Sequence, residues 1–176
     1  YDDASWSSGT AVFGYDDPVT TTISYGANAN LKHPSYYFRR SFDVADASVY
    51  SALIFNIRRD DGAVVYLNGV EVFRTNMPGG TVGYNTIASS SLGGADEINY
   101  FTYRVPTTQL RNGTNVVAVS VHQASRSSSD MLFDLEVSAE TAGNQPPTVS
   151  MNGPVSGSTY LTSASIKLTA DASDID

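Results

Sequence analysis

The sequence predicts an all-β fold, an antiparallel two-sheet β-sandwich of the jelly-roll kind. Apolar residues alternate with polar ones at a period of two along most of the chain, and no stripe with a 3.6-residue period appears. Clusters of Gly, Asn, Asp and Pro separate the alternating stretches at intervals typical of antiparallel sandwiches. The chain has no cysteine, so its core must hold the fold without disulfides.

This alternation predicts about eight strands. Residues 50–58, for example, place Leu53, Phe55 and Ile57 on one face. The predicted strands are 20–25, 36–44, 50–58, 63–68, 70–74, 98–105, 117–121 and 131–137. Residues 105–113 predict one helical turn, in which Pro106 fixes the start and Leu110 closes the end of the sandwich.

The most informative stretch is a predicted β-hairpin that is entered through an acidic loop. Asp60-Asp61-Gly62 and Asn68-Gly69 are turn signals on either side of a short apolar strand, and Asn-Gly suits a two-residue type I′ turn. Adjacent carboxylates repel each other unless they are solvated, hydrogen-bonded or bound to a cation. Two interpretations therefore stay open, a solvated acidic turn and a metal site.

Two long segments, residues 1–19 and 75–97, are rich in Gly, Ser, Asn and Asp with scattered aromatic residues. Loops of this length in a compact domain are usually functional or need additional ordering, for instance by an ion.

The composition changes after Glu140. Residues 141–147 predict a polar linker that ends in a proline pair. Residues 148–176, with strands at about 148–152 and 164–170, resemble the start of a bacterial immunoglobulin-like spacer module. Two strands cannot bury a core of their own, so we expect residues 1–140 to form one domain and the remainder to be a piece of a further module in a modular protein.

Charge and hydropathy exclude several classes of function. The net charge is −8, from 10 basic and 18 acidic residues, which disfavours nucleic-acid partners. No apolar run is long enough to span a membrane. Only 16% of residues are charged, so the surface is polar without being strongly ionic. Such a surface suits a neutral hydroxylated ligand and equally suits a spacer.

The sequence offers no recognisable catalytic constellation. It has no cysteine, two histidines (His33 and His122) and no Gly-x-Ser-x-Gly motif. Two isolated histidines do not form a typical zinc site. We therefore predict that the chain is not an enzyme, and we favour a structural role for His122 over that of a base.

Oxygen ligands are abundant, and calcium binds six to eight oxygens from loop carboxylates and carbonyls. The acidic candidates are Asp2-Asp3, Asp16-Asp17, Asp60-Asp61, Asp96-Glu97 and Asp130. We predict a structural calcium site at Asp60, Asp61 and Asp130, because the neighbouring hairpin holds the Asp60-Asp61 loop rigid. The alternative is a set of solvated turn acids.

Candidate ligand-binding residues are aromatic side chains in polar segments, since aromatic faces stack on sugar C–H groups. We predict Trp6, Tyr15, Tyr25 and Tyr84, together with Arg58 as a polar partner. Trp6 has an alternative role as a core-capping residue, because tryptophan is buried on average. Tyr37 and Tyr100 lie on predicted strands, where they could form a platform on a sheet face.

The hairpin, Asp60-Asp61-Gly62 through Tyr66-Leu67-Asn68-Gly69, resembles one found in galactose-binding-like, jelly-roll carbohydrate-binding domains of secreted bacterial multimodular enzymes. The resemblance covers about residues 1–140. It extends to Trp6-Ser7-Ser8-Gly9, Gly14-Tyr15, Tyr37–Phe42, Asn76-Met77-Pro78, His122-Gln123 and Ser129–Leu135. PA14-type lectin domains have a similar hairpin, and in some of them the paired aspartates hold a calcium that contacts sugar.

This resemblance implies a non-catalytic module of a secreted or cell-surface protein that acts on polysaccharide. Its partners would be a polysaccharide or oligosaccharide and other modules of the same chain. The alternative is a structural or adhesive spacer without a small ligand.

Overall fold

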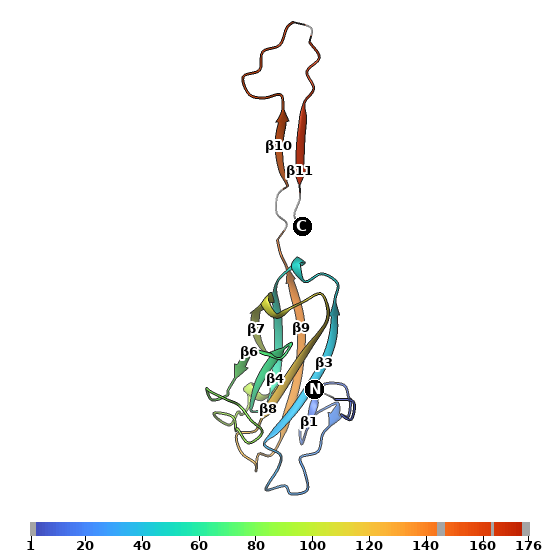
Figure 1. Cartoon of the computed structure of the whole chain (residues 1–176). Helices are drawn as coiled ribbons and strands as arrows, with labels where there is room; N and C mark the ends of the chain where they lie inside the picture. The colour runs from blue at the N-terminus through green and yellow to red at the C-terminus, as the bar shows by residue number, and fades with distance from the viewer. Residues whose placement is uncertain (1–2, 144–146, 163, 174–176) are drawn as a thin grey trace. The chain divides into compact units, whose positions relative to one another are not determined.

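The computed structural model describes residues 3–143, 147–162 and 164–173 (Figure 1). The chain divides into two compact units, Tyr1–Thr141 and Ala142–Asp176. The predicted linker, residues 141–147, spans the boundary between them, and its residues 144–146 lie outside the described residues. Among the described residues, no helix is both long enough and apolar enough to cross a membrane.

The first unit is a two-sheet β-sandwich, as the sequence predicts. One sheet has the strand order β2-β1-β9-β4-β7 and the other β3-β8-β5-β6. Neighbouring strands are antiparallel except β1 and β2, which are parallel. The strands are β1 (Phe13–Tyr15), β2 (Thr21–Thr22), β3 (Ser35–Val44), β4 (Tyr50–Arg59), β5 (Gly62–Leu67), β6 (Val70–Thr75), β7 (Phe101–Pro106), β8 (Gly113–His122) and β9 (Met131–Thr141).

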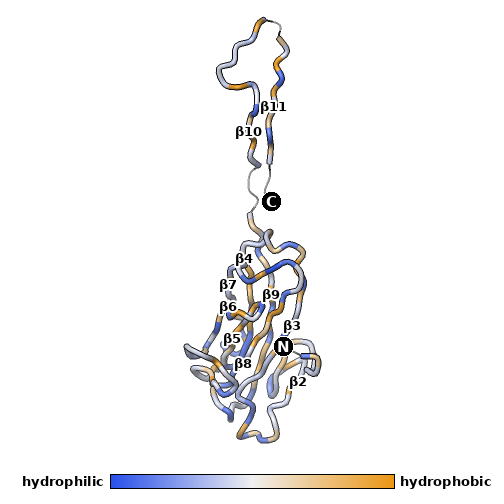
Figure 2. Tube along the Cα trace, in the orientation of Figure 1, coloured by the Kyte–Doolittle hydropathy of each residue, from blue (hydrophilic) through white to orange (hydrophobic). Residues whose placement is uncertain are grey.

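The core lies between the two sheets and follows the predicted alternation. Leu53, Phe55 and Ile57 of β4 are buried, and Val119 and Val121 of β8 belong to the same cluster. Figure 2 shows hydrophobic and hydrophilic residues alternating along the strands. Each inward side chain thus removes apolar surface from water, which is the main favourable contribution to folding.

The predicted hairpin is present. Strands β5 and β6 pair through Leu67 and Val70, and Asn68 and Gly69 both have positive φ, 52° and 84°. These angles are those that a type I′ turn requires of its two central residues.

Three short elements differ from the prediction. The predicted strand 98–105 begins only at Phe101, because α1 (Ala95–Ile98) precedes it and ends with a bond from Asn99 N–H to Ala95 O. Strand β1 was not predicted, since three residues are too few to show a period. Two one-turn 3₁₀ helices complete the unit, η1 (Ala47–Val49) and η2 (Thr107–Gln109). The second is the predicted helical turn, and Leu110 packs against the core after it.

In the second unit, β10 (Thr148–Gly153) pairs antiparallel with β11 (Thr169–Ser173). The second strand lies further along the chain than the predicted range of 164–170. All residues of this pair except Gly153 are exposed, as expected for a two-stranded ribbon with no core of its own.

Candidate functional site

The candidate site is a groove on the outer face of the sheet β3-β8-β5-β6. Its floor is the middle strand β8, where Ala118 and Ser120 point outward with small side chains. Across the sheet, Ser120 lies beside Tyr37 of β3, and Ala118 lies between Arg39 of β3 and Tyr66 of β5. Small residues on the middle strand between large residues on its neighbours leave a channel along β8.

The groove has a volume of about 680 Å³ and is bordered by loops from elsewhere in the chain. Trp6 of the N-terminal segment and Val82-Gly83 of the loop after β6 contribute to its lining. Asn68 and Arg111 line it as well, next to the β5–β6 turn. This volume lies within the range of small-molecule sites, about 300–1,000 Å³.

Two aromatic side chains in the groove are accessible to a ligand. Tyr37 is 47% exposed and Trp6 is 38% exposed. Partial burial raises the pKa of the Tyr37 phenol, and the nearby phenols of Tyr84 and Tyr66 add to the increase. The groove therefore combines aromatic faces with hydroxyl, amide and guanidinium groups, all of which are neutral or cationic at pH 7.

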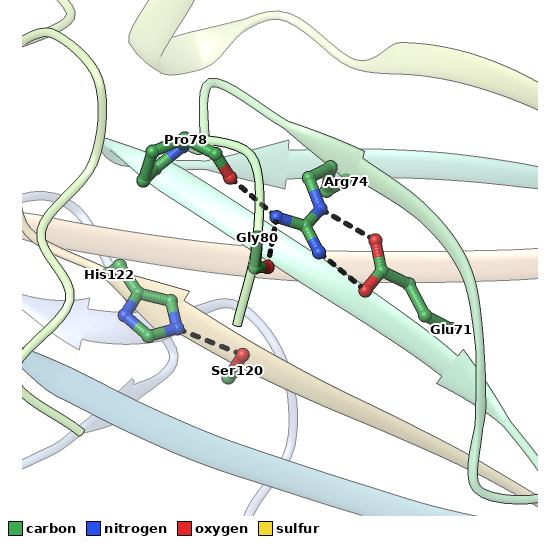
Figure 3. Close-up of polar contacts among 6 residues, drawn as sticks. All are labelled: Glu71, Arg74, Pro78, Gly80, Ser120 and His122. Carbon is green, nitrogen blue, oxygen red and sulfur yellow. Dashed lines mark hydrogen bonds and ion pairs between the residues drawn. The ribbon is translucent and has the colours of Figure 1, made fainter. Parts of the chain in front are cut away.

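The loop of residues 76–94, called here the wall loop, is held to the sandwich by side chains. Arg74 donates from Nη1 to the carbonyls of Pro78 and Gly80, while its Nε and Nη2 bind the Glu71 carboxylate at 2.6 and 2.7 Å (Figure 3). A Cβ at Gly62 would lie 2.7 Å from the carbonyl oxygen of Asn76, so the wall loop packs directly on the Asp-Asp-Gly backbone.

His122 connects the wall loop to the groove floor. Its Nδ1 lies 2.7 Å from the Thr86 carbonyl, which can only accept, so Nδ1 carries the proton. Its Nε2 then accepts from the Ser120 hydroxyl at 2.9 Å (Figure 3). Burial lowers the pKa of His122, which favours the neutral imidazole that this arrangement needs. The geometry supports the structural interpretation of this histidine.

Asp60 and Asp61 are buried, with 2% and 1% exposure, so the interpretation as a solvated acidic turn is wrong. The Asp61 carboxylate accepts backbone N–H groups from Leu92 and Ala124, both at 2.7 Å. Leu92 belongs to the wall loop. Asp61 therefore joins this loop to the segment that follows β8.

Asp60 differs from Asp61, because its Oδ2 is buried without a hydrogen-bond partner, as is Oε1 of Gln123. Burial and the adjacent Asp61 raise the pKa of Asp60 to about 9, and Asp130 and Glu97 contribute to the same shift. The Gln123 amide donates to the Asp130 carbonyl at 2.9 Å, so Gln123 and Asp130 are neighbours.

Acidic side chains from four of the five predicted segments lie close enough to raise one another's pKa values. Burial and then Asp130 raise the pKa of Asp17, and burial, Asp130, Asp17 and Asp61 raise that of Glu97. In the fifth segment, Asp2 lies outside the described residues.

Within the described part of the chain, no group of three or more His, Cys, Asp or Glu side chains is arranged to hold a metal ion. A cation here would need amide or backbone oxygens as additional ligands.

The predicted ligand-binding residues do not form one site. Trp6 lines the groove, and Tyr84, on the wall loop, is 44% exposed beside it. Tyr15 was wrongly predicted as a ligand residue, because it is 3% exposed in the core, where its hydroxyl accepts from Gln123. Tyr25 packs edge-on against Tyr15 at 5.3 Å.

The remaining predicted residue, Arg58, belongs to β4 of the other sheet, and its guanidinium carbon lies 5.5 Å from the Tyr100 ring centroid. Tyr100 therefore lies with that sheet, and Tyr37 and Tyr100 cannot share a platform. The predicted residues missed Tyr66, Arg39, Arg111 and Ser120. The outward positions of Tyr66, Arg39 and Ser120 follow from strand alternation, whereas Arg111 lies in the segment before β8. That the four residues converge depends on the strand order.

The sequence matches no protein-family model and no curated protein. Among solved structures, the chain is similar to part of an α-L-rhamnosidase from Streptomyces avermitilis complexed with L-rhamnose, at 18% identity and a TM-score of 0.43. It is also similar to part of a β-D-mannosidase from Dictyoglomus thermophilum, at 16% identity and a TM-score of 0.33. The alignments cover 68% and 53% of this chain but 10% and 9% of those chains. Similarity at this level identifies no family.

Proposed function

We propose that the first unit is a non-catalytic carbohydrate-binding module of a secreted, polysaccharide-acting protein and that the β8 groove is its ligand site. The observation that carries this proposal is the exposure of Tyr37 and Trp6 in a groove with a floor of small side chains. An aromatic face can stack on the apolar C–H face of a pyranose ring, and an open channel admits a chain of sugars.

Polar groups in the groove match the remainder of a sugar. The Tyr66 hydroxyl and the Arg111 guanidinium can donate to sugar oxygens. Asn68 is already committed, because its amide bonds Gln109 O and Asn115 Oδ1 and its Oδ1 accepts from Val116 N–H. Asn68 therefore has a structural role at the end of the groove and is not assigned a hydrogen bond to the ligand.

A binding role is favoured over hydrolysis by the composition of the groove. Glycoside hydrolases generally use two carboxyl groups that flank the scissile bond. Among the described residues that line the groove, none is Asp or Glu. The carboxyl groups of Asp60 and Asp61 are buried, and that of Asp61 binds the wall loop through Leu92 N–H.

A structural calcium ion near Asp60 forms the second part of the proposal. Asp60 Oδ2 and Gln123 Oε1 are buried oxygens without donors, and such groups normally have a partner. The carboxylates of Asp130, Asp17 and Glu97 add negative charge nearby. Asp61 Oδ1 and Oδ2 each keep a second lone pair after accepting a backbone N–H. This donor set fits a hard cation that binds oxygen.

Isothermal titration calorimetry of the whole chain against a panel of neutral and acidic polysaccharides tests the sugar site. Tyr37→Ala should weaken binding by about tenfold or more, as expected for the loss of an aromatic contact of about 1.5 kcal/mol. Tyr100→Ala is the matched control, because Tyr100 is 49% exposed and lies with the other sheet. Absence of binding to every glycan would favour the alternative, a structural or adhesive spacer.

A further inference from the structure

We infer that the groove prefers a glycan that carries carboxylate groups, a polyuronate, with one carboxylate bound by Arg111. This inference rests on the proposed function, because it names the ligand class of the same groove.

The groove is cationic in a protein that is strongly anionic. The chain has a net charge of −8, yet the described residues that line the groove include Arg39 and Arg111 and no carboxylate. Most surface features of such a chain repel polyanions. A preference for an anionic ligand would therefore have to come from the groove itself.

Arg111 is the cation in the groove that is available to a ligand. Arg39 already forms an ion pair with Asp3 at 2.6 Å. Arg111 uses Nε to bond the Thr114 carbonyl at 3.2 Å, and no described Asp or Glu lies within salt-bridge distance of it. Its two Nη nitrogens can still present a planar pair of donors, which matches the geometry of a carboxylate.

The backbone of Arg111 is held in place by a buried side chain. Asn115 is fully buried; its Oδ1 accepts from Arg111 N–H at 3.0 Å, and its Nδ2 donates to Arg111 O at 2.7 Å. The same Oδ1 accepts from Asn68 Nδ2 at 2.8 Å, so Asn115 also connects the Arg111 backbone to the β5–β6 turn. The position of the arginine is therefore set before a ligand arrives, so less ordering is needed on binding.

Aromatic groups lie in the same channel, with Tyr37 beside Ser120 and Tyr66 beside Ala118. A sugar that stacks on an aromatic ring presents its ring substituents sideways, along the channel. A uronic acid in a chain can therefore place its carboxylate at Arg111 while a neighbouring sugar occupies the aromatic part. A neutral sugar keeps the stacking contact and loses only the charged one.

The central comparison is between polygalacturonate and its methyl ester, which share a backbone and differ in charge. The titrations contain a chelator, because polyuronates bind calcium themselves. The probes are polygalacturonate, the same polymer fully methyl-esterified, alginate, dextran sulfate and a neutral mannan. We expect polygalacturonate or alginate to bind at least about tenfold more tightly than the ester or the mannan at low salt, with the difference shrinking as salt rises. Arg111→Gln should abolish this preference.

Arg104→Gln is the control, because Arg104 is an exposed arginine on β7 of the other sheet, paired with Glu140 at 2.9 Å. It should leave the preference unchanged. Equal or tighter binding of neutral glycans would overturn this inference and leave the proposed function standing. No binding to any probe, by a chain that circular dichroism shows to be folded in the chelator, would overturn both. Preferential binding of dextran sulfate would refute the carboxylate assignment. A preference for polyuronate that survives Arg111→Gln would refute the role of Arg111.

Discussion

Replacing Asp61 with alanine should destabilise the first unit even without any bound ion. The carboxylate of Asp61 is 1% exposed and accepts the N–H groups of Leu92 and Ala124, both at 2.7 Å. Alanine removes both acceptors and leaves two donors without a partner in a place where water has little access. The change also removes a negative charge beside Asp60.

The magnitude follows from these contacts. Hydrogen bonds to charged groups contribute about 1.5–3 kcal/mol each, so two of them amount to about 3–6 kcal/mol. The negative charge of Asp61 also makes ionisation of Asp60 more costly, as the raised pKa of Asp60 shows, so removing that charge offsets part of the loss. The net reduction in the free energy of unfolding is about 2–4 kcal/mol. For a domain of this size that corresponds to a fall in Tm of about 6–15 °C.

Urea unfolding followed by circular dichroism, in excess chelator, measures this loss. Asp43→Ala is the control, since Asp43 is an exposed carboxylate that accepts from Thr114 Oγ1, and its loss should change stability by about 0.5 kcal/mol or less. Hydrogen exchange at the amides of Leu92 and Ala124 should accelerate in Asp61→Ala alone. A destabilisation below about 1 kcal/mol, with exchange unchanged, would refute the assigned role of Asp61 as the anchor of the wall loop.

Three further predictions concern the ion, the domain boundary and catalysis. Excess calcium should raise Tm relative to chelator by mass action, and Gln123→Ala should reduce that difference; coincident melting curves would remove the calcium proposal. A chain that ends at Glu140 should keep a cooperative melt and its glycan affinity, and an aggregated product would mean that the later residues complete the sandwich. The purified chain should not hydrolyse glycosides, esters or phosphate monoesters. Turnover that disappears in a folded His122→Ala variant would make His122 a catalytic base.

The sequence predicts the interior of this fold better than its surface. Alternation places Leu53, Phe55 and Ile57 inward because burial on one face of a strand imposes a period of two. The Asn68-Gly69 turn is equally local, since its conformation depends on those two residues alone. Strand β1 is only three residues long, so the same pattern could not reveal it.

The groove could not be predicted from the sequence, because its residues come together only through the order of the strands. Tyr37 and Tyr100 have similar exposure, and only the strand order shows that Tyr37 lies on one sheet while Tyr100, just before β7, lies next to the other. Tyr15 follows a polar segment and looks accessible in the sequence, but its pairing with Met131 of β9 draws it into the core. The acidic segments could be named individually. Their mutual proximity follows from the way the loops between strands are brought together.

The attachment points of the wall loop have a consequence for the order of folding. The loop bonds to Ser35 at the start of β3, to Asp61 just before β5 and to Gln123 just after β8. These residues come together only when that sheet has formed, so the loop cannot dock on a partly assembled sheet. Contacts between residues so distant in sequence form slowly, because the intervening chain loses conformational entropy before the contact stabilises it. The groove should therefore be the last part of the domain to form and the first to open, and a bound glycan should slow its opening most.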